Sequence, residues 1–133
     1  MAELRGSCLC GAVRFEVAGP LAQPVACHCV QCRKGSGHFT ASTWAPRAAV
    51  KVWGELRWYE YKPGARRGFC PNCGAAMFWE TARDPDNLSI EMGAFDGPTG
   101  LRLARHMFTA EKGDYYALGD GLPGYPGDLE AEG

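Results

Sequence analysis

The chain has 133 residues, of which 46% are hydrophobic, and a formal net charge of -1. This length can bury the core of one domain without help from metal, and no apolar run approaches the roughly 18 residues of a membrane span. We therefore expect no membrane association. The small net charge argues against a general polyanion binder, so we do not expect nucleic acid as a partner.

Strand patterns dominate the chain. Val13, Phe15 and Val17 alternate with polar residues, as a half-buried strand requires. Further strands are predicted at 39–44, 50–53, 56–61, 77–81, 88–92 and 101–108, between clusters of turn residues. The strands at 50–53 and 56–61 flank Gly54-Glu55 and are expected to form a hairpin.

No segment shows a long helical stripe of apolar residues. A single helical turn is expected after Cys32, cut short by Gly35 and Gly37. The sequence therefore predicts an all-β domain, a sandwich or open barrel, over residues 1–118. Residues 119–133 are rich in Gly, Pro and acidic residues, and we expect an extended or mobile acidic tail there.

The seven cysteines fall into three groups. An odd number cannot pair completely within one chain, and residues 1–5 do not have the pattern of a secretory signal. We therefore expect a reducing, cytoplasmic location, where clustered cysteines bind metal more often than they form disulfides or lie inert in a core. The groups are Cys8 and Cys10; Cys27, Cys29 and Cys32; and Cys70 and Cys73.

The first and last groups fit a closed metal site. If Cys8 and Cys10 lie on one strand, their side chains share a face and present two thiolates. Cys70 and Cys73 have the spacing of a zinc-ribbon turn, and Gly74 suits the backbone that follows the second ligand. These four cysteines are predicted to hold a structural zinc. A redox role for the Cys70–Cys73 pair is the competing interpretation, but redox pairs of this spacing occur in a βαβ setting that this chain lacks.

The remaining cysteines, Cys27, Cys29 and Cys32, are one ligand short of a tetrahedral zinc site. In an extended segment His28 faces away from Cys27 and Cys29, so it is poorly placed to ligate. The fourth ligand can be His38, His106, a carboxylate, water or a substrate thiol. A closed structural site is one alternative, and for His106 a role within a sheet is the simpler interpretation.

An open three-cysteine site favours particular chemistry. Zinc with three thiolates has a formal charge of -1, which disfavours water activation and favours a soft thiolate donor. Arg33 and Lys34 are candidates to hold substrate carboxylates, although surface exposure explains them equally well. A proton must also move at the substrate hydroxyl, and His38, His28 or zinc-bound water are the candidates.

Three stretches of this sequence resemble the glutathione-dependent formaldehyde-activating enzyme family. They are Gly6-Ser7-Cys8-Leu9-Cys10-Gly11-Ala12-Val13-Arg14-Phe15, Cys27-His28-Cys29-Val30-Gln31-Cys32-Arg33-Lys34 and Phe69-Cys70-Pro71-Asn72-Cys73-Gly74. The resemblance extends from about Gly6 to Phe108. One departure follows it: residues 111–116 lack the Trp that family members often carry after the His106 region.

The resemblance implies a β-tent fold of antiparallel sheets stapled by a four-cysteine zinc site. It also implies two zinc ions per chain, one on Cys8, Cys10, Cys70 and Cys73 and one on Cys27, Cys29 and Cys32. We expect the second site to lose metal more readily and to be partly empty. The implied activity is that of a carbon-sulfur lyase, which joins glutathione and formaldehyde reversibly into S-hydroxymethylglutathione. The expected partner is therefore a small thiol or thiol adduct.

Two other classes of function remain open. A zinc-stapled binding module without catalysis fits the same fold, because fold does not fix function. It would favour an exposed basic or aromatic surface, whereas an enzyme would favour an open metal position beside cations. Methionine-sulfoxide-type reduction would require a free cysteine late in the chain, and none follows Cys73.

Overall fold

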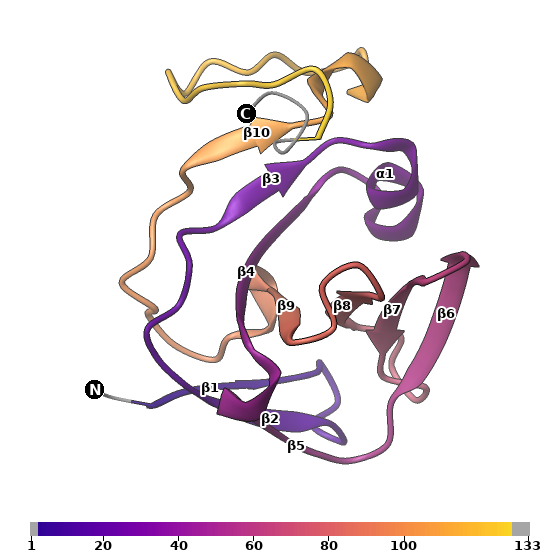
Figure 1. Ribbon diagram of the computed structural model, residues 1–133, viewed down its shortest axis with the longest axis vertical. Coiled ribbons are helices and arrows are strands. Elements are labelled where there is room, and N and C mark those ends of the chain that lie inside the picture. The colour runs from indigo at the N-terminus through magenta and orange to yellow at the C-terminus, as the bar shows by residue number, and fades with distance from the viewer. Residues whose placement is uncertain (1–2, 129–133) are drawn as a thin grey trace. The chain divides into compact units, whose positions relative to one another are not determined.

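The computed structural model describes residues 3–128, which divide into two compact units. The described part of the first unit comprises residues 3–22 and 43–100, and that of the second comprises 23–42 and 101–128. Strands dominate both units, and one short α-helix lies in the second (Figure 1). The expectation of a mostly β protein with antiparallel sheets is confirmed in this form.

The first unit contains an antiparallel sheet in the order β1-β2-β5. Its strands are β1 (Glu3–Ser7), β2 (Arg14–Ala18) and β5 (Val50–Trp53). Four more strands of this unit run antiparallel in the order β9-β8-β7-β6. They are β6 (Arg57–Lys62), β7 (Ala65–Phe69), β8 (Ala76–Thr81) and β9 (Asn87–Glu91). Two 3-10 turns, Arg47–Ala49 and Met92–Ala94, precede β5 and follow β9.

Both sets of strands in the first unit contribute to one hydrophobic core. Val13, Phe15 and Val17 are buried, which confirms the alternation predicted for this strand. The Phe15 ring packs edge-on against Phe78 at 5.3 Å and against Phe95 at 5.4 Å between centroids. Aromatic pairs of this geometry contribute stability beyond the area that they bury. Phe15 therefore links β2 to β8 within this core.

The prediction that residues 50–53 and 56–61 form a hairpin around Gly54 is wrong. The strand β5 pairs with β2, and β6 pairs with β7. Gly54 adopts a φ of 100°, and a Cβ at this position would lie 2.2 Å from the carbonyl oxygen of Ala12. Only glycine fits this left-handed and crowded turn, which directs the chain from one sheet to the other.

Two strands of the first unit were not predicted. They are β1 and β7, which contain glycine and charged residues in place of the apolar alternation of a typical strand. Pairing with neighbouring strands stabilises both segments in spite of their sequence.

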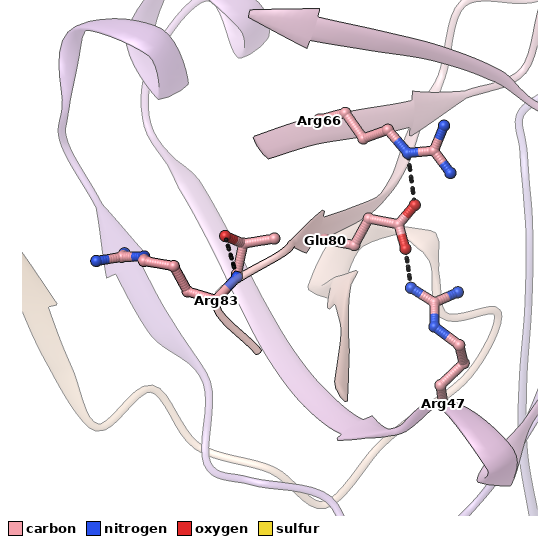
Figure 2. Close-up of polar contacts among 5 residues, drawn as sticks. Arg47, Arg66, Glu80 and Arg83 are labelled. Carbon is pink, nitrogen blue, oxygen red and sulfur yellow. Dashed lines mark hydrogen bonds and ion pairs between the residues drawn. The ribbon is translucent and has the colours of Figure 1, made fainter. Parts of the chain in front are cut away.

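A shared carboxylate links the segment before β5 to the sheet of β7 and β8. Glu80 of β8 pairs with Arg47 and with Arg66, whose Nε lies 2.6 Å from Oε1 of Glu80 (Figure 2). The Arg66 guanidinium also lies 4.4 Å from the centre of the Trp58 ring. Both oxygens of this carboxylate therefore have a cationic partner.

The opposite face of the same strands has a different character. Cross-strand register places Tyr59 beside Arg67, Arg67 beside Trp79, and Trp79 beside Ser89. Glu91 follows Ser89 by two residues and shares its face, because side chains alternate along a strand. We call this surface the Arg67 face. It comprises Tyr59, Arg67, Trp79, Ser89 and Glu91.

The second unit is built on the strand order β10-β3-β4. Its strands are β3 (Val25–Cys27), β10 (Arg105–Met107) and β4 (Thr40–Pro46), whose last residues continue into the first unit. The strand β4 is antiparallel to β3, whereas β10 is parallel to it, so antiparallel pairing is not universal. The strand expected over 101–108 is confirmed only for residues 105–107, near the end of the predicted range.

The helix α1 (Val30–Ser36) begins before Cys32 and includes Gly35, which corrects the expected single turn. Cys29 is its N-cap, and Gly37 ends it with a φ of 89°. Glu111, in the 3-10 turn Thr109–Glu111, accepts a hydrogen bond of 2.9 Å from the Val30 amide. The two caps stabilise a helix that residue propensity alone disfavours.

Backbone hydrogen bonds join residues 123–127 to β10 and the segment after it. His106 donates to Pro123 and accepts from Tyr125, and the Phe108 amide donates to Gly127. Composition did not predict this pairing within the expected tail. Residues 129–133 of that tail lie outside the described residues, and the domain boundary at 118 stays a prediction.

Within residues 3–128, no helix has the length and apolar character needed to cross a membrane.

Burial raises the pKa of Glu91 to about 7, although the positive charge of Arg67 lowers it. The folded state therefore holds a proton between about pH 4.5 and 7 that the unfolded state has released. We predict that the unfolding free energy of the native protein, relative to Glu91→Gln, falls by at most about 3 kcal/mol over this range as the pH rises. Denaturant unfolding at several pH values checks this, and parallel curves for the two proteins would contradict it.

Candidate metal centres

The four-cysteine cluster lies entirely in the first unit, where Cys8, Cys10, Cys70 and Cys73 come together. Each pair occupies a tight turn that follows a strand: the Gly11 amide donates to the Cys8 carbonyl at 3.2 Å, and Gly74 to Cys70 at 2.8 Å. Gly11 and Gly74 have φ values of 83° and 79°, so the expected role of Gly74 is confirmed. The expectation that Cys8 and Cys10 share a strand is wrong, because β1 ends at Ser7 and both thiols lie in the turn.

The sulfur spacing in this cluster fits a tetrahedral metal. The Sγ atoms of Cys8 and Cys10 are 3.6 Å apart, and those of Cys10 and Cys70 are 3.8 Å apart. A tetrahedral zinc with bonds of about 2.3 Å requires sulfur atoms about 3.8 Å apart, whereas a disulfide requires about 2 Å. All seven cysteines are free thiols. The cluster therefore has the dimensions of a metal site.

Hydrogen-bond donors surround the sulfur atoms. The Val13 amide lies 3.2 Å from Cys8 Sγ, and the Cys73 amide lies 3.4 Å from Cys70 Sγ. The side-chain amide of Asn72 donates to Cys10 Sγ at 3.3 Å. Such bonds offset the negative charge that four thiolates would bring to one metal.

The three-cysteine cluster lies entirely in the second unit. Cys27 ends β3, Cys29 caps α1 and Cys32 lies in the first turn of that helix. Their Sγ atoms lie within 4.8 Å of one another, and no fourth His, Cys, Asp or Glu among residues 3–128 joins them. The cluster could hold a metal ion with one position left for another ligand.

The three thiols of this cluster interact strongly. Hydrogen bonds from the Cys27 and Cys32 side chains lower the pKa of Cys29 far below its ordinary value. The hydrogen bond between Cys27 and Cys29 raises the pKa of Cys27, and burial raises it further. The Cys32 amide also donates to Cys29 Sγ at 3.3 Å. In the absence of metal, Cys29, which caps the helix, is therefore the cysteine of this cluster that most readily forms a thiolate.

The three histidines proposed as ligands or acid-base groups all have other partners. His38 Nδ1 lies 2.5 Å from the Tyr115 hydroxyl on the exposed surface. His28 is fully buried and His106 is 3% exposed, and their rings join at 2.9 Å between Nε2 of His28 and Nδ1 of His106. The expectation that His28 would lie outside the sulfur cluster is consistent with this placement.

These two buried rings belong to a hydrogen-bonded chain with a fixed direction. Asp120 Oδ2 lies 2.8 Å from His106 Nε2, and its carboxylate has its pKa held below its usual value by the Leu122 amide and by His106. His106 Nε2 therefore donates to Asp120, so its Nδ1 accepts from His28 Nε2. His28 Nδ1 then accepts from the Tyr116 hydroxyl at 2.6 Å. Burial lowers the pKa of His28, which favours this neutral arrangement.

The predicted cations lie on α1. Arg33 is half-buried, and among the described residues its Nε has no hydrogen-bond partner although the atom is buried. Lys34 is exposed. Both follow Cys32 directly, but whether they bind substrate stays a prediction.

Sequence reasoning missed Tyr115, Tyr116 and Asp120. The two tyrosines stand where the resemblance leads one to expect Trp, and each bonds a histidine close in sequence to the cysteine cluster. Their rings pack together at 4.7 Å and surround His38 at 5.4 and 4.6 Å. The departure from the family pattern was the available signal.

The comparisons with known proteins agree with these features. The profile of the glutathione-dependent formaldehyde-activating enzyme family matches residues 3–111, and the chain belongs to this family. The match includes all seven cysteines.

Individual relatives are distant but cover most of the chain. A Halomonas elongata protein, named provisionally as a glutathione-dependent formaldehyde-activating enzyme, is 30% identical over 97% of this chain and 92% of its own. A Schizosaccharomyces pombe protein named as an uncharacterized lyase is 26% identical over 87% of this chain and 85% of its own. A crystal structure of a Rhodobacter sphaeroides protein has a TM-score of 0.59 and 27% identity, covering 72% of this chain and 91% of that one.

We predict that Tyr116→Phe lowers the unfolding free energy by about 1–3 kcal/mol, because it leaves buried Nδ1 of His28 without a donor. Tyr115→Phe is the matched control, since it removes an equivalent bond to the exposed His38, and we expect a loss below about 1 kcal/mol. Denaturant unfolding measures both. Equal losses for the two variants would contradict a structural role of the buried chain.

Proposed function

We propose that this protein is a zinc-dependent carbon-sulfur lyase that acts on a glutathione-type thiol-aldehyde adduct, such as S-hydroxymethylglutathione. The observation that carries the proposal is the three-cysteine cluster, in which no fourth ligand from residues 3–128 completes the site. Membership of the formaldehyde-activating family supports the substrate class. The β-tent architecture, the reducing compartment and a structural role for the four-cysteine site belong to the same proposal.

Zinc held by Cys27, Cys29 and Cys32 would supply a Lewis-acidic position that accepts a thiolate sulfur. Three thiolates reduce the affinity of this position for hydroxide, so a substrate thiol competes well for it. Cys8, Cys10, Cys70 and Cys73 would hold a second zinc that has no open position and links two distant turns. Two zinc ions per chain follow.

In the lyase direction, the carbon-sulfur bond of the adduct breaks and its electron pair stays on sulfur. The adduct hydroxyl loses its proton as the carbon becomes the aldehyde carbonyl, so the products are a thiolate, a proton and an aldehyde. The reverse direction joins the same components. No oxidant or reductant is required in either direction.

His38 is our candidate for the group that accepts this proton. If Nδ1 donates to the Tyr115 hydroxyl, then Nε2 carries the lone pair needed for a base. His28 is a weaker candidate, because both of its ring nitrogens already have partners in the buried chain. Arg33 and Lys34 would bind substrate carboxylates, and the buried unpaired Nε of Arg33 supports a ligand-binding role.

The test uses metal counting and cobalt substitution. We predict two metal ions per native chain and about one in Cys29→Ala, with the fold retained because the four-cysteine site is intact. Glutathione should alter the sulfur-to-cobalt charge-transfer bands of the native protein and leave those of Cys29→Ala unchanged. The native protein should also convert S-hydroxymethylglutathione to formaldehyde and glutathione faster than the uncatalysed reaction, and the variant should not exceed the uncatalysed rate.

Retained lyase activity in Cys29→Ala, or bands in the native protein that do not respond to glutathione, would contradict the proposal. The second result would instead favour a zinc-stapled binding module.

A further inference from the structure

The Arg67 face carries a carboxylate that lacks the partners such a group normally has. Glu91 is half-buried, yet among residues 3–128 its side chain makes no hydrogen bond or ion pair. Glu80, on the other face of the same strands, has one arginine on each oxygen (Figure 2). A carboxylate that is partly removed from water without such partners is costly, so Glu91 requires an explanation beyond folding.

Arg67 supplies the positive charge that acts on Glu91. Its guanidinium lies 5.7 Å from the centre of the Tyr59 ring, and the described residues offer it no ion pair. Arg67 influences Glu91 electrostatically, but the two groups do not form a direct contact. Register places both residues on one face with β8 between their strands, so this face of the sheet presents a cation and a carboxylate, and neither has an ion-pair partner among the described residues.

Aromatic groups border this charged pair. Tyr59 is 54% exposed, and Trp79 is half-buried with its indole N–H already donated to the Tyr61 hydroxyl at 3.1 Å. The rings therefore offer flat apolar surface and do not compete for Glu91. Solvent reaches the face, so a ligand can reach it as well.

We propose that the Arg67 face binds the amino-acid end of a ligand, with Arg67 holding an α-carboxylate and Glu91 holding the neighbouring α-ammonium. The two groups of such a ligand are opposite in charge, as are the two side chains, which share this face without pairing with each other. Bidentate binding of a carboxylate by arginine and a charged bond from ammonium to carboxylate are among the stronger polar contacts.

The identity of the ligand rests on the proposed function. Glutathione ends in a γ-glutamyl group that carries both an α-carboxylate and an α-ammonium. Its thiol is a separate group, so binding at the Arg67 face can be measured without any metal-sulfur bond. S-methylglutathione is the appropriate probe, because its sulfur is blocked.

The experiment titrates the zinc-loaded protein with S-methylglutathione and with its analogue that lacks the α-ammonium, followed by NMR shifts. We expect Glu91→Gln to weaken S-methylglutathione binding about tenfold or more and to leave the analogue unaffected. Arg67→Met should weaken both ligands by a similar factor. Glu55→Gln and Arg102→Met are matched controls, because both residues are exposed, lie outside the Arg67 face, and undergo the same changes of charge.

The proposal is overturned if S-methylglutathione does not bind, or if Glu91→Gln and Arg67→Met bind it as their controls do. Thermal unfolding of each variant shows whether weaker binding comes from a lost contact or from a lost fold. In the native protein, the difference in affinity between S-methylglutathione and the analogue without the α-ammonium tests the proposal without any substitution. If glutathione does not change the cobalt charge-transfer bands but Glu91→Gln and Arg67→Met weaken binding as predicted, the lyase proposal is contradicted and the binding role of the Arg67 face is supported. If the cobalt bands respond to glutathione but the variants bind S-methylglutathione as their controls do, the lyase proposal is supported and the binding role of the Arg67 face is contradicted.

Discussion

The spacing of sulfur atoms is the constraint on which both units depend. Each unit gathers its own cysteines, four in the first and three in the second, and none is shared between them. In the first unit, the Sγ atoms of Cys8 and Cys10 lie 3.6 Å apart after β1, and a separation of 3.8 Å between Cys10 and Cys70 brings this turn beside the turn after β7. Thiolates at such distances repel one another unless protons or a metal lie between them. A metal ion could therefore link these two turns.

The second unit is organised around the segment that carries the other three cysteines. Cys29 caps α1, Glu111 binds the first amide of that helix, and His28 anchors the other side of the segment to His106. The hydrogen-bonded side chains that run from Tyr116 through the two histidines to Asp120 thus order the backbone between Cys27 and Cys29 from the side opposite to their sulfur atoms. This arrangement brings three thiols together, and no fourth ligand from residues 3–128 joins them, as a site open to an external thiol requires.

Local pattern predicted some of this architecture and missed the rest for physical reasons. The alternation at Val13, Phe15 and Val17 and the division of the cysteines were readable, because periodicity and ligand spacing are local properties. The hairpin at Gly54 was wrong because strand pairing depends on distant partners, and β1 and β7 lack an apolar pattern of their own. Tyr116 and Asp120 act through contacts across the fold, and Glu91 is distinguished by its burial, so no spacing in the sequence marks these residues.

The central claim is that the second cluster accepts a sulfur ligand from outside the chain, whereas the first cluster does not. Cadmium-113 NMR of the cadmium-substituted protein tests it directly, because the chemical shift of cadmium reports the number of sulfur ligands. The account predicts two resonances, of which only that of Cys27, Cys29 and Cys32 moves toward the four-sulfur position when glutathione is added. Two resonances that both lie at the four-sulfur position beforehand, or that both ignore glutathione, would contradict it.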